Sequence, residues 1–149
     1  MQRSTTSSGF PDINVWVALT WSGHVHHVIA RRWFETVDKR ERLFFCRLTQ
    51  LGLLRLLSTE ALMGRDDVLN QPAAWEAYDR WRADDRVGFL DEPADLEREF
   101  RALTRLGHPA PKDWADSYLA AFASVARLTV VTFDSALQRK SGGAVLLKV

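Results

Sequence analysis

Short apolar runs alternate along the chain with longer stretches in which apolar residues recur at helical spacing. The apolar runs predict strands at residues 10–14, 42–46, 87–90, 128–133 and 144–149. The longer stretches predict helices at residues 15–21, 25–37, 49–57, 72–85, 94–106, 113–127 and 135–140, with residues 58–70 irregular. Strands that alternate with helices favour a parallel sheet covered on both faces, so we expect an α/β fold.

The length of 149 residues is typical of one domain with a substantial core. A formal net charge of +1 excludes a polycation that would coat nucleic acid over its whole surface. Of the 20 basic residues, however, 16 are arginine, the side chain best suited to bidentate contacts with phosphate or carboxylate. Local basic patches are therefore expected, and they would face either nucleic acid or an acidic partner.

The cysteine content and the N-terminus indicate where the protein works. Cys46 is the single cysteine, which excludes an internal disulfide and fits a reducing compartment. Its place in an apolar run predicts a buried side chain. No stretch approaches the roughly 20 apolar residues that a membrane span requires. Residues 1–9 are polar and unlike a secretory signal, so we expect a disordered leader on a cytoplasmic protein.

Three aspartates lie where apolar runs give way to predicted helices: Asp12, Asp116 and Asp134. Each alone has a structural explanation, since Asp12 and Asp134 fit helix N-caps and Asp116 fits the first turn of a helix. Together they suggest a site, because the C-terminal ends of parallel strands and the adjacent helix starts converge on one crevice. Carboxylates gathered there repel one another, and Mg²⁺ or Mn²⁺ would offset that repulsion. This chemistry indicates a metal-dependent phosphodiesterase.

The ordered motifs of the chain resemble those of the PIN-domain family, and within it the VapC-type toxins of bacterial toxin–antitoxin pairs. The matching stretches are PDINVWVAL at 11–19, GHVHHVIARRWF at 23–34, CRLTQLGLLRLLS at 46–58, WADSYLAAFA at 114–123 and LTVVTFDSAL at 128–137. The resemblance implies a three-layer α/β/α domain over residues 10–149, with a mainly parallel, twisted sheet of four to five strands. It also implies a Mg²⁺-dependent endoribonuclease that cleaves RNA of the tRNA or rRNA class, with Mn²⁺ as a substitute.

The family's site residues carry over by position. Asp12 matches its first acid and Asp116 the acid that begins the long helix, so both are expected to bind the metal. Asp134 matches the last acid, and Thr132 the small hydroxyl before it. The second acid, usually a glutamate, falls on Gln50, which keeps an acceptor oxygen but cannot take up a proton at neutral pH.

This departure bears on the mechanism. With three formal charges in place of four, the site is expected to hold a single metal ion, with Asp116 or Asp134 helping to align the attacking water. Asn14, Arg47 and Arg55 are candidates for contacts to the substrate, although both arginines could equally pair with surface acids. The alternative that Gln50 leaves open is a catalytically weak or silent PIN fold that binds RNA or its antitoxin.

Partners follow from the same resemblance: a VapB-type antitoxin, an RNA substrate and a second copy of the chain in a homodimer. Trp75, Tyr78 and Trp81 recur at spacing three and are expected to contribute to the core or to an interface. A phosphotransfer domain is disfavoured, because its motif requires an aspartate where this chain has Asn14. The histidines at 24, 26 and 27 are expected to lie in a solvated turn rather than to bind zinc.

Overall fold

The computed structural model describes residues 8–148 and contains one parallel sheet of five strands in the order β3-β2-β1-β4-β5. The strands are β1 (Ser8–Pro11), β2 (Arg42–Phe45), β3 (Val87–Phe89), β4 (Thr129–Thr132) and β5 (Val145–Leu146). All four pairings are parallel, and β1 lies at the centre between β2 and β4. The prediction of a parallel sheet of four to five strands is confirmed.

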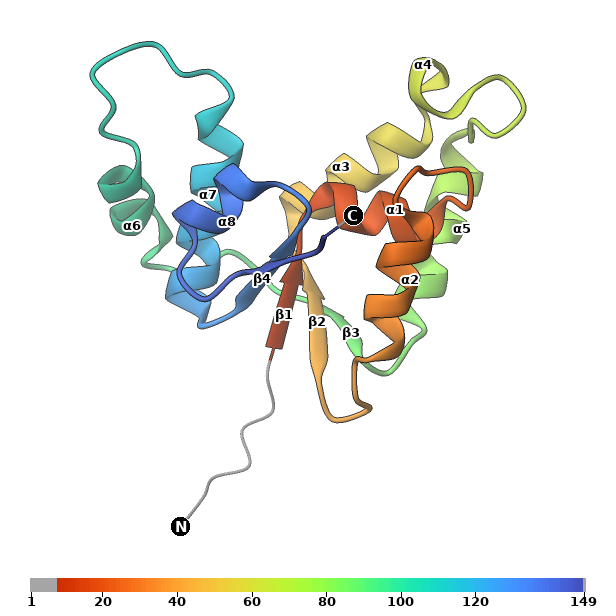
Figure 1. The fold of residues 1–149 in the computed structure, drawn as a ribbon, viewed down its shortest axis with the longest axis horizontal. Coiled ribbons are helices and arrows are strands. Elements are labelled where there is room, and N and C mark those ends of the chain that lie inside the picture. The colour runs from red at the N-terminus through yellow and green to blue at the C-terminus, as the bar shows by residue number, and fades with distance from the viewer. Residues whose placement is uncertain (1–7, 149) are drawn as a thin grey trace.

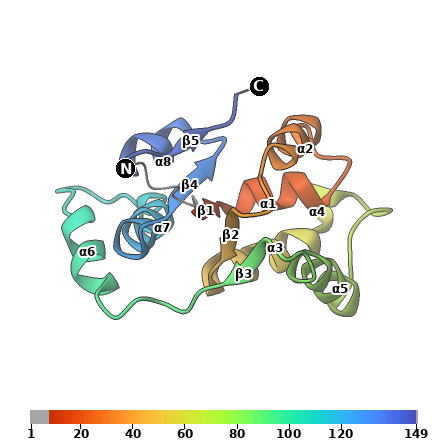
Figure 2. The same cartoon turned by 90° about the horizontal axis from the view of Figure 1, so that it is seen from below.

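Helices cover both faces of this sheet (Figure 1). Viewed from below in Figure 2, α6, α7 and α8 lie on one side of the strands and α1, α2, α3 and α5 on the other. The helices are α1 (Ile13–Thr20), α2 (His27–Glu35), α3 (Arg47–Leu57), α4 (Glu60–Met63), α5 (Gln71–Arg82), α6 (Leu96–Leu103), α7 (Asp113–Ala126) and α8 (Ser135–Lys140). None of them is long and apolar enough, within residues 8–148, to cross a bilayer.

Two hydrophobic cores hold the layers together, one on each face of the sheet. On the face covered by α1, the ring of Trp16 stacks on Phe45 with centroids 4.0 Å apart. On the face covered by α7, Phe10 stacks on Phe122 at 4.9 Å. Cys46 is buried in this second core, as its apolar surroundings predicted. In β2, Leu43 and Phe45 belong to the first core and Phe44 packs against the second, so alternate residues face opposite cores, which fixes the register of this strand.

The two helices nearest the centre approach closely at a glycine. A Cβ added at Gly52 in α3 would lie 2.4 Å from Cδ1 and 2.7 Å from Cγ1 of Ile13 in α1. Only a residue without a side chain therefore allows this packing. Since Ile13 directly follows Asp12, the contact also fixes where α1 begins.

Several element ends differ from the predicted ones. The first strand begins at Ser8 and ends at Pro11, because the Asp12 carboxylate caps the helix that follows. Residues 1–7 of the predicted leader, and residue 149 of the last strand, lie outside the described part of the chain. Within the stretch predicted to be irregular, Glu60–Met63 forms α4.

Local hydrogen bonds explain why one helix begins later, and another ends earlier, than predicted. The second helix begins at His27, two residues later than predicted, because the amides of His24 and His27 close successive turns onto Trp21 and His24. The fifth helix ends at Arg82, three residues early, and the carboxylate of Asp84 then accepts from the Arg86 amide in a tight turn.

Candidate functional site

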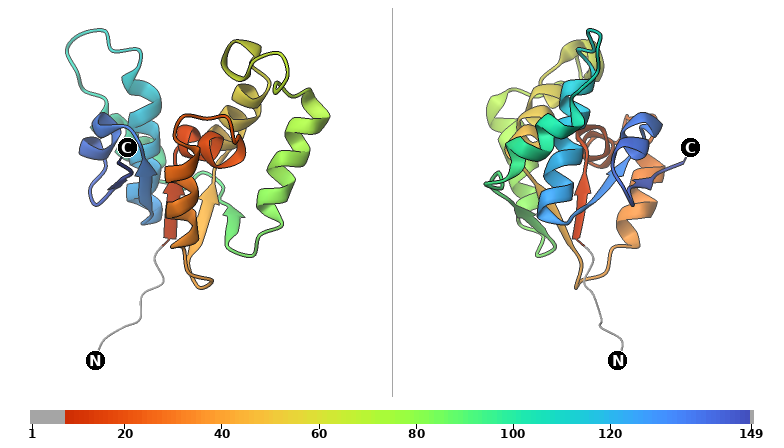
Figure 3. Two further views of the ribbon diagram at one scale, coloured as in Figure 1. Left: turned by 45° about the vertical axis from the view of Figure 1, so that its right-hand side comes forward. Right: turned by 90° about the vertical axis from the view of Figure 1, so that its left-hand side faces the viewer.

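Asp12 lies at the C-terminal end of the central strand, where α1 begins. Its amide donates to the carbonyl of Val131 in β4 at 3.0 Å, and its Oδ1 accepts from the Val15 amide at 3.0 Å. The carboxylate therefore caps α1, and only 6% of the residue is exposed. Figure 3 shows α1 and α8 both beginning at the end of the sheet that lies away from the N-terminus.

Thr132 links the two acids that follow neighbouring strands. Its Oγ1 donates to Asp12 Oδ2 at 2.5 Å and accepts from the Asp134 amide at 2.9 Å. Asp134 in turn caps α8, since its Oδ1 accepts from the Ala136 amide at 2.8 Å. Both predicted N-caps are thus confirmed. One buried hydroxyl fixes Asp12 and the start of the loop that carries Asp134.

Asp116 completes what we call the three-acid cluster, formed by Asp12, Asp116 and Asp134. It is half-buried in the first turn of α7, where its negative charge interacts favourably with the helix dipole, as predicted. Burial, together with the smaller effect of the Asp116 and Asp134 charges, raises the pKa of Asp12 to about 6. Partial burial raises the pKa of Asp116, and the negative charges of Asp134 and Asp113 act in the same direction. The structure therefore brings the three acids within electrostatic range of one another.

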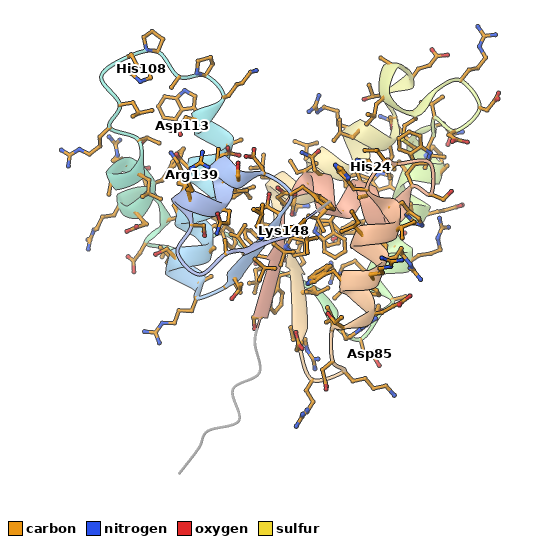
Figure 4. The ribbon with its side chains drawn as sticks, viewed as in Figure 1. His24, Asp85, His108, Asp113, Arg139 and Lys148 are labelled. Atoms are coloured by element: carbon orange, nitrogen blue, oxygen red, sulfur yellow. The ribbon has the colours of Figure 1, made fainter. Side chains whose placement is uncertain are left out.

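A cation beside the cluster was missed by sequence analysis. Lys140, at the end of α8, donates to Asp113 Oδ1 and, at 2.8 Å, to Ser117 Oγ. The Ser117 hydroxyl donates to Asp113 Oδ2 at 2.9 Å, and Lys140 also lowers the pKa of Asp116. Figure 4 labels Asp113 at the start of α7 and His108 on the loop before it. The i, i+4 spacing of Asp113 and Ser117 was the one local signal.

The residues after β2 are arranged around Arg47. Its Nη1 donates to Gln50 Oε1 at 2.5 Å, and its guanidinium lies 4.7 Å from the centre of the Phe89 ring. Gln50 is 7% exposed. The side-chain oxygen of Gln50, expected from the sequence to orient a metal or water, therefore accepts a hydrogen bond from Arg47.

Two other predicted substrate contacts lie apart from Arg47. Arg55, in the last turn of α3, is about 12 Å further along the helix at 1.5 Å per residue. It lines a separate hollow of about 470 Å³ with Trp75. Asn14 is exposed on the first turn of α1, close in sequence to Asp12.

The histidine turn is less exposed than predicted. All three histidines are half-buried, and the ring of His26 stacks on Phe133 with centroids 4.6 Å apart. His27 Nδ1 lies 2.7 Å from the carbonyl oxygen of Ala18. The prediction of a solvated turn is therefore correct for Ser22, Gly23 and Val25, which are exposed, whereas His26 packs on Phe133. That contact joins residues over 100 positions apart, so no local pattern could have indicated it.

The oxygen donors of the cluster suit a divalent cation. A carboxylate as buried as Asp12, close to two further acids, is costly without a neutralising charge. Among residues 8–148, no three His, Cys, Asp or Glu side chains are gathered tightly enough to hold a metal by themselves. Mg²⁺ usually keeps several waters and needs only one or two carboxylates. The residues present therefore fit a hydrated Mg²⁺ rather than an ion enclosed by protein ligands.

Comparison with known proteins agrees with this arrangement. The model of the family described as PIN domain matches residues 10–143. The chain belongs to the PIN-domain family. Ribonuclease VapC41 of Mycobacterium tuberculosis is 42% identical over 134 residues, which are 88% of this chain and 92% of that protein. The chain is therefore a PIN-domain protein of the VapC type.

Solved structures share the fold at low sequence identity. VapC20 of Mycobacterium tuberculosis, described as a sarcin–ricin loop cleaving toxin, superposes with a TM-score of 0.65 at 18% identity, covering 88% of this chain and 93% of that one. VapBC2 of Rickettsia felis, solved on a DNA fragment from its promoter, gives a TM-score of 0.66 at 14% identity, covering 93% and 96%. These similarities establish the fold.

Proposed function

We propose that this PIN-domain protein is the toxin of a type II toxin–antitoxin pair and acts as a Mg²⁺-dependent endoribonuclease in the cytoplasm. The observation that carries the proposal is Asp12, a buried carboxylate at the end of the central strand that is held by two hydrogen bonds and whose pKa is raised by the charges of Asp116 and Asp134. Carboxylates with strongly perturbed pKa values cluster at functional sites, which supports this assignment. The name of the relative VapC41, a ribonuclease, supports RNA as the substrate.

Each residue of the proposed site has a distinct task. Bound Mg²⁺ would polarise a phosphoryl oxygen and acidify water. Asp12, Asp116 and Asp134 would hold the hydrated ion, and the Thr132 hydroxyl keeps one Asp12 oxygen oriented. Asp116 is half-exposed with a raised pKa, so it is suited to accept a proton from the attacking water. Arg47, at the same edge of the sheet, would bind a phosphate of the substrate.

The partners follow from the relatives. A further solved neighbour, from Klebsiella pneumoniae, is described as a toxin–antitoxin complex, which supports a VapB-type antitoxin for this chain. The neighbour VapC20 is described as cleaving the sarcin–ricin loop, which supports a structured RNA of the tRNA or rRNA class. We further propose a homodimer as the active form, with Mn²⁺ able to replace Mg²⁺.

The test is cleavage of total cellular RNA by purified protein, with ends mapped by sequencing. Wild type should give Mg²⁺-dependent ends that EDTA abolishes and Mn²⁺ restores. Asp12→Asn, which keeps the shape of the side chain, should lose at least 100-fold in rate. Asp85→Asn is the matched control, since Asp85 is exposed and lies near the opposite end of the sheet (Figure 4). Cleavage that survives in Asp12→Asn would contradict the proposal.

A second candidate is a catalytically silent PIN module that binds RNA or its antitoxin. The neutral Gln50, where the family usually has an acid, is the observation in its favour. The two functions differ in calorimetry with Mg²⁺. A nuclease should show binding heat that Asp12→Asn and Asp116→Asn remove, whereas a silent module shows none that depends on these residues.

A further inference from the structure

Arg47 begins α3 just beyond the C-terminal end of β2, the strand next to the one that Asp12 follows. Strands β1 and β2 pair so that Gly9 lies opposite Leu43. Three residues further along each strand, Asp12 is level with Cys46, and Arg47 is the next residue in the chain. The guanidinium lies over Phe89 of β3, so it is at the same edge of the sheet as the buried carboxylate but on the side of β2 away from β1.

The contacts that hold Arg47 carry no charge. Its Nη1 donates to the amide oxygen of Gln50 at 2.5 Å, and its guanidinium lies over the Phe89 ring at 4.7 Å. Among the ion pairs within residues 8–148, none includes Arg47. In contrast, the charge of Arg86 is neutralised by Asp84, to which its guanidinium donates two hydrogen bonds. Arg47 is therefore held in place without being neutralised.

A second arginine shares the same aromatic ring. The guanidinium of Arg82 lies 6.0 Å from the Phe89 centroid, and its Nη1 donates to the Tyr78 hydroxyl at 2.9 Å. Arg82 also forms no ion pair within the described part of the chain. Phe89 thus supports two exposed guanidiniums, each hydrogen-bonded to an uncharged partner.

We propose that Gln50 and Phe89 are positioning residues that hold Arg47 as an uncompensated cation for one RNA phosphate, with Arg82 binding a second. The inference rests on the proposed function, because it supplies a cation for a polyanionic strand at the same edge of the sheet as the three carboxylates. A guanidinium whose orientation is fixed binds phosphate bidentately and loses little side-chain freedom. A glutamate at position 50 would also hold the guanidinium, but it would cancel its charge.

The test measures RNA binding without cleavage. The probe is a fluorescein-labelled single-stranded 12-mer of random sequence, titrated at several KCl concentrations into full-length protein carrying Asp12→Asn. Each phosphate contact contributes about 0.7 to the slope of log affinity against log salt. Gln50→Glu should reduce the slope by about 0.7 and weaken binding at least fivefold. Gln71→Glu, which adds the same charge at an exposed position of α5, should leave both unchanged.

Further variants separate charge from packing. Arg47→Gln removes the cation without disturbing buried Gln50, and it should reduce the slope as Gln50→Glu does. Arg82→Gln should reduce it by a further step of about 0.7. Gln50→Met, which loses the acceptor but adds no charge, should weaken binding two- to threefold at an unchanged slope. An unchanged slope in Arg47→Gln, or tighter binding in Gln50→Glu, would overturn the inference.

Cleavage assays distinguish this inference from the proposed function. With Asp12 intact, Gln50→Glu should raise KM for RNA and leave kcat within about twofold. A rise in kcat would instead mean that position 50 serves the metal, which contradicts a positioning role. If the slopes do not change while cleavage still depends on Asp12, the inference fails and the nuclease remains. If cleavage is independent of Asp12, the proposed function itself fails.

Discussion

The buried hydroxyl of Thr132 donates a hydrogen bond of 2.5 Å to Asp12 Oδ2, and the two residues are 120 positions apart in sequence. The bond joins the ends of β1 and β4, which are neighbours in the sheet. Thr132 also accepts from the Asp134 amide. One side chain therefore couples the charge state of Asp12 to the position of Asp134.

Replacement of this hydroxyl should affect both stability and charge. Thr132→Val keeps the shape but leaves an Asp12 oxygen without its donor, so we expect a loss of about 1–3 kcal/mol in the free energy of unfolding. The pKa of Asp12 should rise further, because the lost bond lowers it. Thr132→Ser should retain most of both properties. Urea denaturation at pH 7 and NMR titration of the carboxyl measure the two effects, and equal behaviour of the Val and Ser variants would contradict them.

The pKa of Asp12 predicts an unusual pH dependence of stability in the metal-free protein. Burial raises this pKa from 3.8 to about 6, so between these values the folded state keeps a proton that the unfolded state has lost. The stabilisation of the folded state by this proton is fully present below about pH 4 and is lost as the pH rises through about 6. It amounts to about 3 kcal/mol.

The difference between wild type and Asp12→Asn isolates this effect from other titrating groups. Thermal unfolding in EDTA should show Asp12→Asn gaining on wild type from pH 4 to pH 7. Asp85→Asn serves as the control and should show no such trend. Saturating Mg²⁺ should reverse the order at pH 7, since metal binds the ionised carboxylate. A constant difference across this pH range would count against the burial of Asp12 as the cause.

The local parts of the site could be predicted from the sequence. Asp12 and Asp134 follow apolar runs and precede helices, and the structure makes both of them N-caps. The alternation of strands and helices indicated the parallel sheet, and such a sheet brings its C-terminal ends to one edge. Asp116 belongs to a helix start, so the same rule indicated that it lies close by.

Contacts between side chains from distant segments could not be predicted. Arg47 contacts Phe89 because β2 and β3 are neighbours, and no spacing in the sequence indicates that pairing. Lys140 reaches Asp113 across 27 positions because α8 packs against α7. A four-residue helix such as α4 has too few periodic positions to differ from an irregular segment.

Lys140 should affect both the carboxyl pKa values and the Mg²⁺ affinity of the three-acid cluster. Its ammonium lowers the pKa of Asp116 and of Asp113, so Lys140→Met is expected to raise both. Removal of this cation should also strengthen Mg²⁺ binding by a few-fold, because a dication is then repelled less. NMR titration and calorimetry test the two effects. Lys39→Met, in an exposed turn before β2, is the control, and weaker Mg²⁺ binding in Lys140→Met would contradict the prediction.

Gly52 should be essential for placing Asp12, although it lies in another helix. Alanine usually stabilises a helix relative to glycine by up to about 1 kcal/mol. Here the added Cβ would lie 2.4 Å and 2.7 Å from two Ile13 atoms, and Ile13 is branched at Cβ, so it has little freedom to turn away. We therefore expect Gly52→Ala to lower the free energy of unfolding by about 1–3 kcal/mol. Activity should fall too, because a displaced Ile13 moves the neighbouring Asp12 away from Thr132.

The double variant Ile13→Ala with Gly52→Ala tests this cause, because the smaller side chain leaves room for the new methyl group. If the two single effects were additive, their sum would give one value for the free energy of unfolding of the double variant. The measured value should be higher than this by at least about 1 kcal/mol. Urea denaturation of the four proteins gives this coupling. Additive losses would mean that the two helices do not compete for the same space, and the start of α1 would then be held by the Asp12 cap alone.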